Sequence, residues 1–266
     1  MMTPHKIPVY QIDSFTDQAF GGNPAAVCPL EAWCEDALLQ KIARENNLSE
    51  TAFLVPDGDA YEIRWFAPCA EVRLCGHATL AAATVVFRFL QPDLQELRFR
   101  SPYDELQVER QNDGFLMDFP RFSYLEKKIE DCPHELRTFG LCAVYEGNET
   151  LVLRLESEVD VHNYQANLDY LKKRGIYLSV TAPGEHCDFV SRFFAPAVGI
   201  DEDPVTGSVH CLLAPIWANI LGKTQLEALQ LSDRQGKLIL SLADSRVKIF
   251  GQAVCVMQGE IYPKGM

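Results

Sequence analysis

Two segments of the chain are apolar on nearly every helical face, and they predict two buried helices. The first runs from about His77 to Phe89 and the second from Val209 to Leu221. A helix that is apolar all round is buried, because it has no face that water can solvate. Each segment begins beside small residues, Gly76 in the first and Gly207-Ser208 in the second. We therefore expect two cores, each organised around one helix.

The segments that precede the two helices repeat each other. Residues 61–68 (YEIRWFAP) match residues 189–196 (FVSRFFAP) at an offset of 128, with Arg, Phe, Ala and Pro in register. The offset is close to half of the 266-residue chain, which indicates the internal duplication of a whole domain. We predict an N-terminal half made of residues 1–119 plus 252–266 and a C-terminal half made of residues 120–251.

The pattern of the remaining segments predicts strands around each helix. A helix is also predicted over residues 36–46, from four apolar residues at helical spacing, and a shorter one over residues 168–174, which Gly175 ends. The fold class is α+β, an α/β roll in which each half is a mostly antiparallel rolled sheet around a central buried helix. The main predicted strands are 9–15, 25–30, 52–56, 60–67, 97–101, 105–110, 115–119, 151–155, 176–181, 189–194, 226–231, 237–242, 246–251 and 253–261.

Charge and cysteine content narrow the classes of function. The net charge is -13 and no basic stripe is present, so neither a nucleic acid nor a membrane is expected as a partner. The N-terminus lacks the apolar region of a signal peptide, and no apolar run reaches membrane-spanning length. Nine cysteines without C-x-x-C spacing fit free thiols in a reducing compartment. We predict a cytoplasmic protein.

The turn before the second helix carries three adjacent carboxylates, Asp201, Glu202 and Asp203. Asp203 and Ser208 have the residue types that cap a helix, because their oxygens accept from free backbone N–H groups. However, three carboxylates are more than a cap needs. Their repulsion would raise the pKa of one carboxyl or direct it at a cationic ligand. Capping and ligand binding both remain open.

Two residues of the first half are candidates for proton transfer. Glu50 lies where a loop meets a strand, among apolar neighbours that would raise its carboxyl pKa into the range of a general acid and base. His77 begins the first buried helix. It is either a capping or core histidine or a hydrogen-bonding group of a site, and a helix N-terminus favours its uncharged imidazole.

Cys75 allows a different chemistry. A Cys-Gly pair before a buried helix is similar to the thiol of two-base racemases, and a helix N-terminus acidifies a thiol. Those enzymes need a second thiol in the other half, where Asp203 stands here, so a small buried residue is the favoured interpretation of Cys75. We predict no metal site, because His186-Cys187 and His210-Cys211 are adjacent pairs that cannot both point at one ion.

The two helix starts predict an anion site. A helix N-terminus carries unpaired N–H donors and partial positive charge, and Gly76 and Gly207 keep these donors accessible. A carboxylate should therefore bind near Gly76-His77 or Gly207-Ser208. Asp203 would meet an amino or hydroxyl group of the same ligand, which indicates a small hydroxy or amino acid.

Four motifs, in this order, resemble those of the PhzF (phenazine biosynthesis-like) family. They are GNPAAV at residues 22–27, NLSETAF at 47–53, CGHAT at 75–79 and DEDPVTGS at 201–208. The resemblance implies a diaminopimelate-epimerase-like fold with two similar halves and an active site between them. It also implies an isomerase that needs no cofactor and often forms a homodimer.

The resemblance assigns roles to residues. It implies that Glu50 is the general base and acid, and that His77 and Asp203 join it at the catalytic site. Many family members carry a cysteine at the position of Cys75 without a paired-thiol mechanism. The predicted substrate-binding residues are Asn23, Ser49, Gly76, Thr206, Gly207 and Ser208.

We therefore predict a cofactor-independent isomerase that moves a proton on a small carboxylate-bearing substrate, with Glu50 as acid and base. Two alternatives stay open. One is a two-base epimerase or racemase that uses Cys75. The other is a non-catalytic, ligand-sensing interaction protein.

Overall fold

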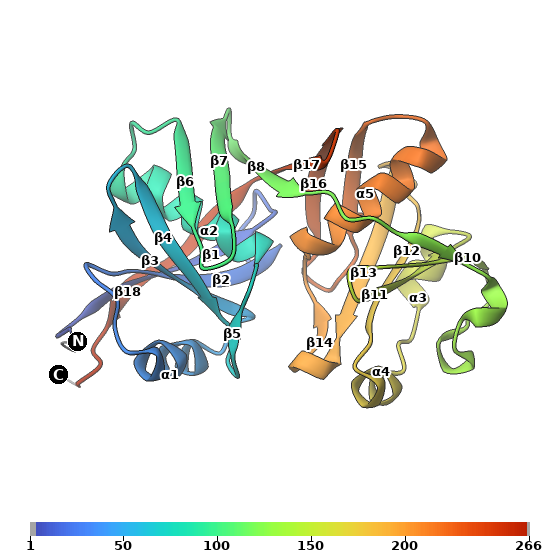
Figure 1. Ribbon diagram of the computed structural model, residues 1–266, viewed down its shortest axis with the longest axis horizontal. Helices are drawn as coiled ribbons and strands as arrows, with labels where there is room; N and C mark the ends of the chain where they lie inside the picture. The colour runs from blue at the N-terminus through green and yellow to red at the C-terminus, as the bar shows by residue number, and fades with distance from the viewer. Residues whose placement is uncertain (1–3, 265–266) are drawn as a thin grey trace. The chain divides into compact units, whose positions relative to one another are not determined.

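The computed structural model describes residues 4–264 and divides into two compact units (Figure 1). Unit 1 comprises Met1–Asp118 and Phe250–Met266, and unit 2 comprises Phe119–Ile249. The predicted N-terminal half includes residues 1–3 and 265–266, which lie outside the described part of the chain.

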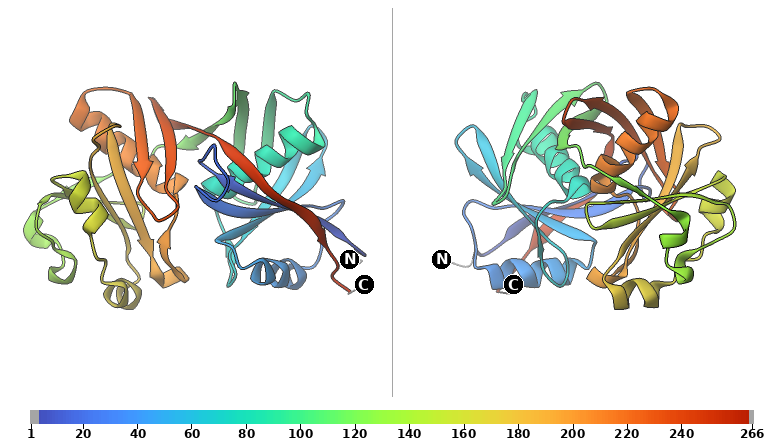
Figure 2. Two further views of the ribbon diagram at one scale, coloured as in Figure 1. Left: turned by 180° about the vertical axis from the view of Figure 1, so that it is seen from behind. Right: turned by 45° about the vertical axis from the view of Figure 1, so that its right-hand side comes forward.

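Unit 1 is a mixed, mostly antiparallel sheet. Two of its strand pairs, β2–β3 and β4–β6, are parallel. The C-terminal strand β18 returns to pair with the N-terminal strand β1 along its whole length (Figure 2). The strands are β1 (Ile7–Ser14), β2 (Asn23–Pro29), β3 (Glu50–Asp57), β4 (Ala60–Phe66), β5 (Glu71–Val72), β6 (Glu96–Arg100), β7 (Glu105–Gln111), β8 (Gly114–Pro120) and β18 (Ala253–Ile261).

The helix α2 (Gly76–Val85) forms the centre of unit 1, and all ten of its residues are buried. It packs against β1, β2, β3 and β18 (Figure 1). The amphipathic helix α1 (Asp36–Asn46) buries Leu39, Ile42 and Ala43 and leaves its other face to water. It ends at Asn47, whose left-handed backbone closes the last turn.

Unit 2 is built in the same way around α5 (Gly207–Leu221), with β11–β12 and β13–β15 as its parallel pairs. Its other helices are α3 (Glu158–Asn163) and α4 (Leu168–Arg174), and its short helical turns are η2 (Ile129–Asp131), η3 (His134–Leu136) and η4 (Pro196–Val198). The strands are β9 (Leu125–Lys127), β10 (Leu141–Gly147), β11 (Thr150–Leu155), β12 (Tyr177–Pro183), β13 (Phe189–Ala195), β14 (Ile200–Asp203), β15 (Gln225–Gln230), β16 (Gly236–Ala243) and β17 (Arg246–Gly251).

The strand pairing of unit 1 recurs in unit 2. In unit 1, β3 is parallel to β2 and antiparallel to β4, and a crossover containing α2 joins β4 to its parallel partner β6. In unit 2, β12 is parallel to β11 and antiparallel to β13, and a crossover containing α5 joins β13 to β15. The predicted α+β class with two pseudo-symmetric halves is confirmed.

Each of the two buried helices differs from its predicted form at the C-terminal end of the helix. The α-helical part of the first ends at Val85, and a π-helical turn, η1 (Val86–Leu90), carries the chain outward to the exposed Phe89. The second helix was predicted to be buried throughout, yet its last turn is exposed at Ile220 and Leu221. In both cases the apolar pattern continues beyond the end of the core, so the pattern alone overstates the burial.

The helix α3 was not predicted. Ser157 accepts a hydrogen bond from the backbone N–H of Asp160, and the Asp160 carboxylate accepts one from the backbone N–H of Ser157. This reciprocal capping box is a sequence signal that the hydrophobic pattern does not contain. Among residues 4–264, none of the helices combines the length and the apolar content that a membrane-spanning segment needs.

The turn before β2 generates a test of backbone packing. Gly22 has a φ of +58°, and a Cβ atom there would lie 2.0 Å from the backbone oxygen of Ser14. Gly58 has a φ of +63° with open space around it. We expect Gly58→Ala to lower the free energy of unfolding by roughly 1–2 kcal/mol, the cost of a left-handed backbone. Gly22→Ala should cost about 1–3 kcal/mol more, because atoms must also move apart.

Urea denaturation of both variants checks this expectation. Equal losses in the two variants would show that the Gly22 turn relaxes without strain.

Candidate functional site

Glu50 and His77 meet in unit 1 because of where their elements begin. Glu50 is the first residue of β3, and its neighbour in the parallel strand β2 is Ala25. His77 is the second residue of α2, the helix that the sheet surrounds. Both side chains are buried, with exposed fractions of 7% for Glu50 and 4% for His77. The structure therefore brings together two of the predicted catalytic residues that lie far apart in sequence.

The His77 ring has a partner at each nitrogen. Its Nε2 atom lies 3.1 Å from the Glu50 Oε2 atom, and its Nδ1 atom lies 3.1 Å from the Asn23 Nδ2 atom. The Asn23 amide can serve both protonation states of the ring, because its tip carries a donor and an acceptor. Ser14 donates a hydrogen bond to the backbone oxygen of His77 at 2.8 Å. Asn23 of β2 thus orients the ring, and Ser14 of β1 holds the backbone of the same residue.

The electrostatics of His77 differ from the prediction. A helix N-terminus alone favours an uncharged imidazole, and burial also lowers the pKa of His77. Attraction to Cys75 and Glu50 outweighs burial and raises the pKa of His77 well above its ordinary value. The Glu50 carboxylate is the decisive partner at neutral pH, because the Cys75 thiol is protonated there. The direction of this shift is opposite to the one that the helix N-terminus and burial alone would give.

Cys75 lies beside His77, with its Sγ atom 3.5 Å from Nδ1 and 3.9 Å from Nε2. Burial raises the pKa of the Cys75 thiol to about 11, and the Glu50 carboxylate adds to this effect. A helix N-terminus was expected to acidify this thiol, but burial outweighs that effect here. A thiol of this pKa is a poor base at neutral pH.

The three carboxylates in the acidic turn of unit 2 have different surroundings. Glu202 forms a two-pronged ion pair with Arg192, at 2.7 and 2.8 Å. Asp201 is exposed, whereas Asp203 is buried and accepts a hydrogen bond from the Thr206 hydroxyl. The predicted mutual repulsion is avoided because each carboxylate has a different environment.

The capping interpretation of Asp203 and Ser208 is wrong. The N-cap of α5 is Thr206, and no side chain caps it. Asp203 contacts the Thr206 side chain, and Ser208 is half-buried within the first turn. The backbone N–H of Thr206 donates to the Gln230 Oε1 atom at 2.9 Å, so it is not open to a ligand.

Gln230, which was not among the predicted site residues, holds the turn before α5 in place. Its Nε2 atom donates to the Asp203 backbone oxygen at 2.7 Å, and the residue is fully buried. A signal was present, because Leu226, Ala228 and Gln230 occupy the same inward face of β15. A polar residue at an otherwise apolar, inward-facing position of a strand indicates a buried side chain that is hydrogen-bonded.

The remaining predicted site residues lie in the same two regions. Ser49 is half-buried in the bend before β3, and Gly76 begins α2. Gly207 is buried at the start of α5. Unit 1 therefore holds Asn23, Ser49, Glu50, Gly76 and His77, and unit 2 holds Asp203, Thr206, Gly207 and Ser208.

Glu50, Cys75 and His77 together form a cluster of metal-ligand type. One potential ligand atom from each lies within 4.8 Å of the others, and all three residues are buried. This cluster was not predicted, because Glu50 is remote in sequence from Cys75 and His77 and only adjacent His-Cys pairs suggested metal ligands.

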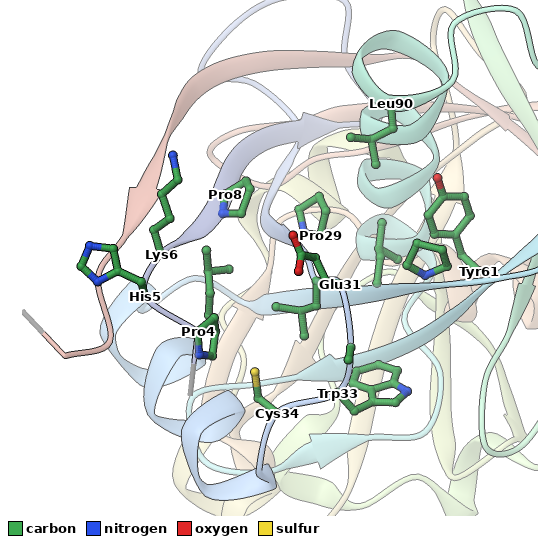
Figure 3. A pocket seen from close by; sticks show the side chains of 15 residues that line it. Pro4, His5, Lys6, Pro8, Pro29, Glu31, Trp33, Cys34, Tyr61 and Leu90 are labelled. Carbon is green, nitrogen blue, oxygen red and sulfur yellow. The ribbon is translucent and has the colours of Figure 1, made fainter. Parts of the chain in front are cut away.

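A separate cavity of about 890 Å³ lies in unit 1 (Figure 3). Trp33, Tyr61, Leu90 and several prolines line it. None of the predicted site residues does so. The cavity is therefore distinct from the Glu50–His77 pair.

Two helix-centred units with this strand pairing define an epimerase-like fold. Hydroxyproline epimerase from Agrobacterium vitis shares the fold at 10% identity, with a TM-score of 0.63 over 98% of this chain and 94% of that one. The chain belongs to the phenazine biosynthesis-like (PhzC-PhzF) protein family, whose model matches residues 12–259.

Closer relatives cover nearly the whole chain. A PhzF-family protein from Enterococcus faecalis has 39% identity and a TM-score of 0.92, over 97% of this chain and 99% of that one. A Pseudomonas aeruginosa protein named an uncharacterized isomerase is 45% identical over 261 residues, which are 96% of this chain and 98% of the relative.

The buried His210 of α5 makes the stability of unit 2 depend on pH. Its Nδ1 atom lies 2.7 Å from the Thr206 backbone oxygen, and burial lowers the pKa of His210 from 6.5 to about 4. The unfolded state therefore takes up a proton at a higher pH than the native state. Stability present above about pH 6.5 should be lost as the pH falls towards 4, by on the order of 3 kcal/mol.

Urea denaturation of the wild type across this pH range, followed by hydrogen exchange of the α5 amides, measures the loss. His210→Asn should show a smaller loss, and the exposed control His162→Asn should behave like the wild type. A loss of the same size in His210→Asn would assign it to other groups.

Proposed function

We propose that the protein is a cofactor-independent isomerase in which Glu50 moves a proton on a small carboxylate-bearing substrate. The observation that carries the proposal is the environment of the Glu50 carboxylate. It is buried, its Oε2 atom is shielded from solvent, and that atom lies 3.1 Å from the His77 Nε2 atom. Burying a carboxylate costs free energy of desolvation, and a buried carboxylate beside a histidine is an arrangement typical of functional sites.

The proton transfer uses one carboxyl group twice. The Glu50 carboxylate takes a proton from a carbon next to a carbonyl or unsaturated group, and the bonding electrons shift into that system. The neutral carboxyl then returns the proton to a different carbon of the same molecule. The substrate is thereby isomerised with no net change in protons or electrons. Such general acid and base catalysis contributes about 10²–10⁴-fold.

His77 positions Glu50 and supports its charge. A donor at Nε2 stabilises the carboxylate before the proton transfer, and Asn23 fixes the ring from the other side. The first turn of α2 begins at Gly76, so backbone N–H groups that have no partner within the helix lie next to this pair. These groups suit the substrate carboxylate, which supports a small hydroxy or amino acid as the substrate class.

Glu50→Gln tests the base. The amide matches the carboxylate in shape, so the fold should be retained, but it cannot accept a proton at carbon. The enzyme is incubated in D₂O with a panel of small hydroxy, amino and unsaturated cyclic acids, and mass spectrometry detects the acid that takes up deuterium. The rate of uptake should fall by at least ~10² in the variant.

The matched control for the base is Glu45→Gln, an exposed position on α1. It should exchange deuterium at the wild-type rate. Uptake that is undiminished in Glu50→Gln would remove Glu50 from the mechanism.

Cys75→Ala tests the alternative of a two-base cysteine epimerase. The observation that favours this alternative is the short distance of 3.5 Å between the Cys75 Sγ atom and His77 Nδ1. The high pKa of the Cys75 thiol argues against it as a base, and Asp203 stands where the second thiol would be. We expect Cys75→Ala and Cys75→Ser to retain most of the deuterium exchange of the wild type. A loss as deep as that of Glu50→Gln, with unchanged circular dichroism, would favour the racemase mechanism.

A further inference from the structure

We propose that Glu50, Cys75 and His77 form a binding site for a thiophilic divalent cation such as Zn²⁺, which blocks the proton-transferring carboxylate. The inhibitory effect rests on the proposed function, whereas the binding itself does not. The three side chains supply a carboxylate oxygen, a sulfur and an imidazole nitrogen, which are the ligand types that zinc prefers.

The distances within the cluster match those of a tetrahedral zinc site. With ordinary bond lengths of about 2.3 Å to sulfur and about 2.0–2.1 Å to nitrogen or oxygen, the sulfur and nitrogen lie about 3.5 Å apart and the nitrogen and oxygen about 3.3 Å. The Cys75 Sγ atom lies 3.9 Å from the His77 Nε2 atom, the nitrogen that contacts Glu50, which is about 0.4 Å longer than the ideal distance. The His77 Nε2 and Glu50 Oε2 atoms lie 3.1 Å apart. Small side-chain rotations are sufficient to coordinate an ion.

The surroundings of the cluster also suit a cation. The Glu50 Oε2 and His77 Nε2 atoms lie 3.1 Å apart, so an ion can replace the proton between them and take both atoms as ligands. Asn23 engages the Nδ1 atom of His77, which leaves Nε2 as the coordinating nitrogen and fixes the ring from behind. Three protein ligands leave a fourth tetrahedral position for water.

The charges balance when the ion binds. The Cys75 thiol and, where it is protonated, the His77 ring release their protons to the solvent. The site then contains one thiolate, one carboxylate, one neutral imidazole and a doubly positive ion, so its net charge is zero. A neutral site suits a buried position, because an unbalanced buried charge is strongly unfavourable. Binding should therefore release one to two protons per ion and weaken as the pH falls.

A cobalt titration tests the site without any substrate. The protein used is the full chain with the exposed cysteines replaced, C69S/C142S, so that these thiols cannot contribute. Addition of Co²⁺ should produce the near-ultraviolet thiolate-to-cobalt absorption band, saturating at one ion per chain, and excess Zn²⁺ should remove it. Calorimetry in buffers of different ionisation enthalpy should give the predicted proton release.

Variants in the same background identify the ligands. Cys75→Ala should abolish the band, and Glu50→Gln and His77→Gln should weaken cobalt binding at least ~10-fold. The matched control is Cys211→Ala, a buried cysteine in unit 2 that is also close to a histidine in sequence, which should keep the band. Absence of the band in the parent, its persistence in Cys75→Ala, or full affinity in Glu50→Gln would overturn the proposal.

The inhibitory effect is measured separately by deuterium exchange. Zn²⁺ should slow exchange in the parent, a chelator should restore it, and Cys75→Ala should need at least ~10-fold more Zn²⁺ for the same effect. Equal sensitivity of the parent and Cys75→Ala would overturn the inhibition. Full deuterium exchange in Glu50→Gln would contradict the proposed function but not the metal site. Whether the metal binds is tested separately, by the cobalt titration.

Discussion

The burial of a helix without a polar face is the constraint on which unit 1 depends. All ten residues of α2 are hidden from water, so strands must surround the helix. The first turn of such a helix carries backbone N–H groups that have no partner within the helix. A buried N-terminus needs polar neighbours, and Glu50, Asn23 and Ser14 lie around His77 at this point. The same constraint that builds the core therefore places a buried cluster of polar side chains within it.

Much of the fold could be predicted from the sequence because each signal is local and repeated. The predicted helix over residues 36–46 agrees with α1. Gly175 ends α4 as predicted, because the helix closes with a left-handed backbone conformation that glycine adopts easily. The internal repeat indicated two similar halves, and the two crossovers containing α2 and α5 have that symmetry. Helix ends were less well predicted, because exposed Leu221 and buried Leu213 have the same side chain but different positions relative to the sheet.

The candidate site was predictable in its members but not in its electrostatics. Motif resemblance identified Glu50 and His77, whereas the distance of 3.1 Å between them depends on how β3 and α2 pack. That distance reverses the expected direction for the pKa of His77, and burial does the same for Cys75. Gln230 was overlooked because it belongs to no motif, although it holds the turn before α5.

The pairing of β1 with β18 determines the order in which the units can form during synthesis. Ile7 pairs with Ile261, so the strand beside β1 is completed only when residue 261 has left the ribosome. Unit 2 is one continuous segment, Phe119–Ile249, and can close its own sheet earlier. Until then β1 exposes one edge and half of its hydrogen-bonding groups, which is a hazard for aggregation. Nascent chains that stall before β18 would therefore carry a finished second unit and an open first one, and these chains would be substrates for holding chaperones.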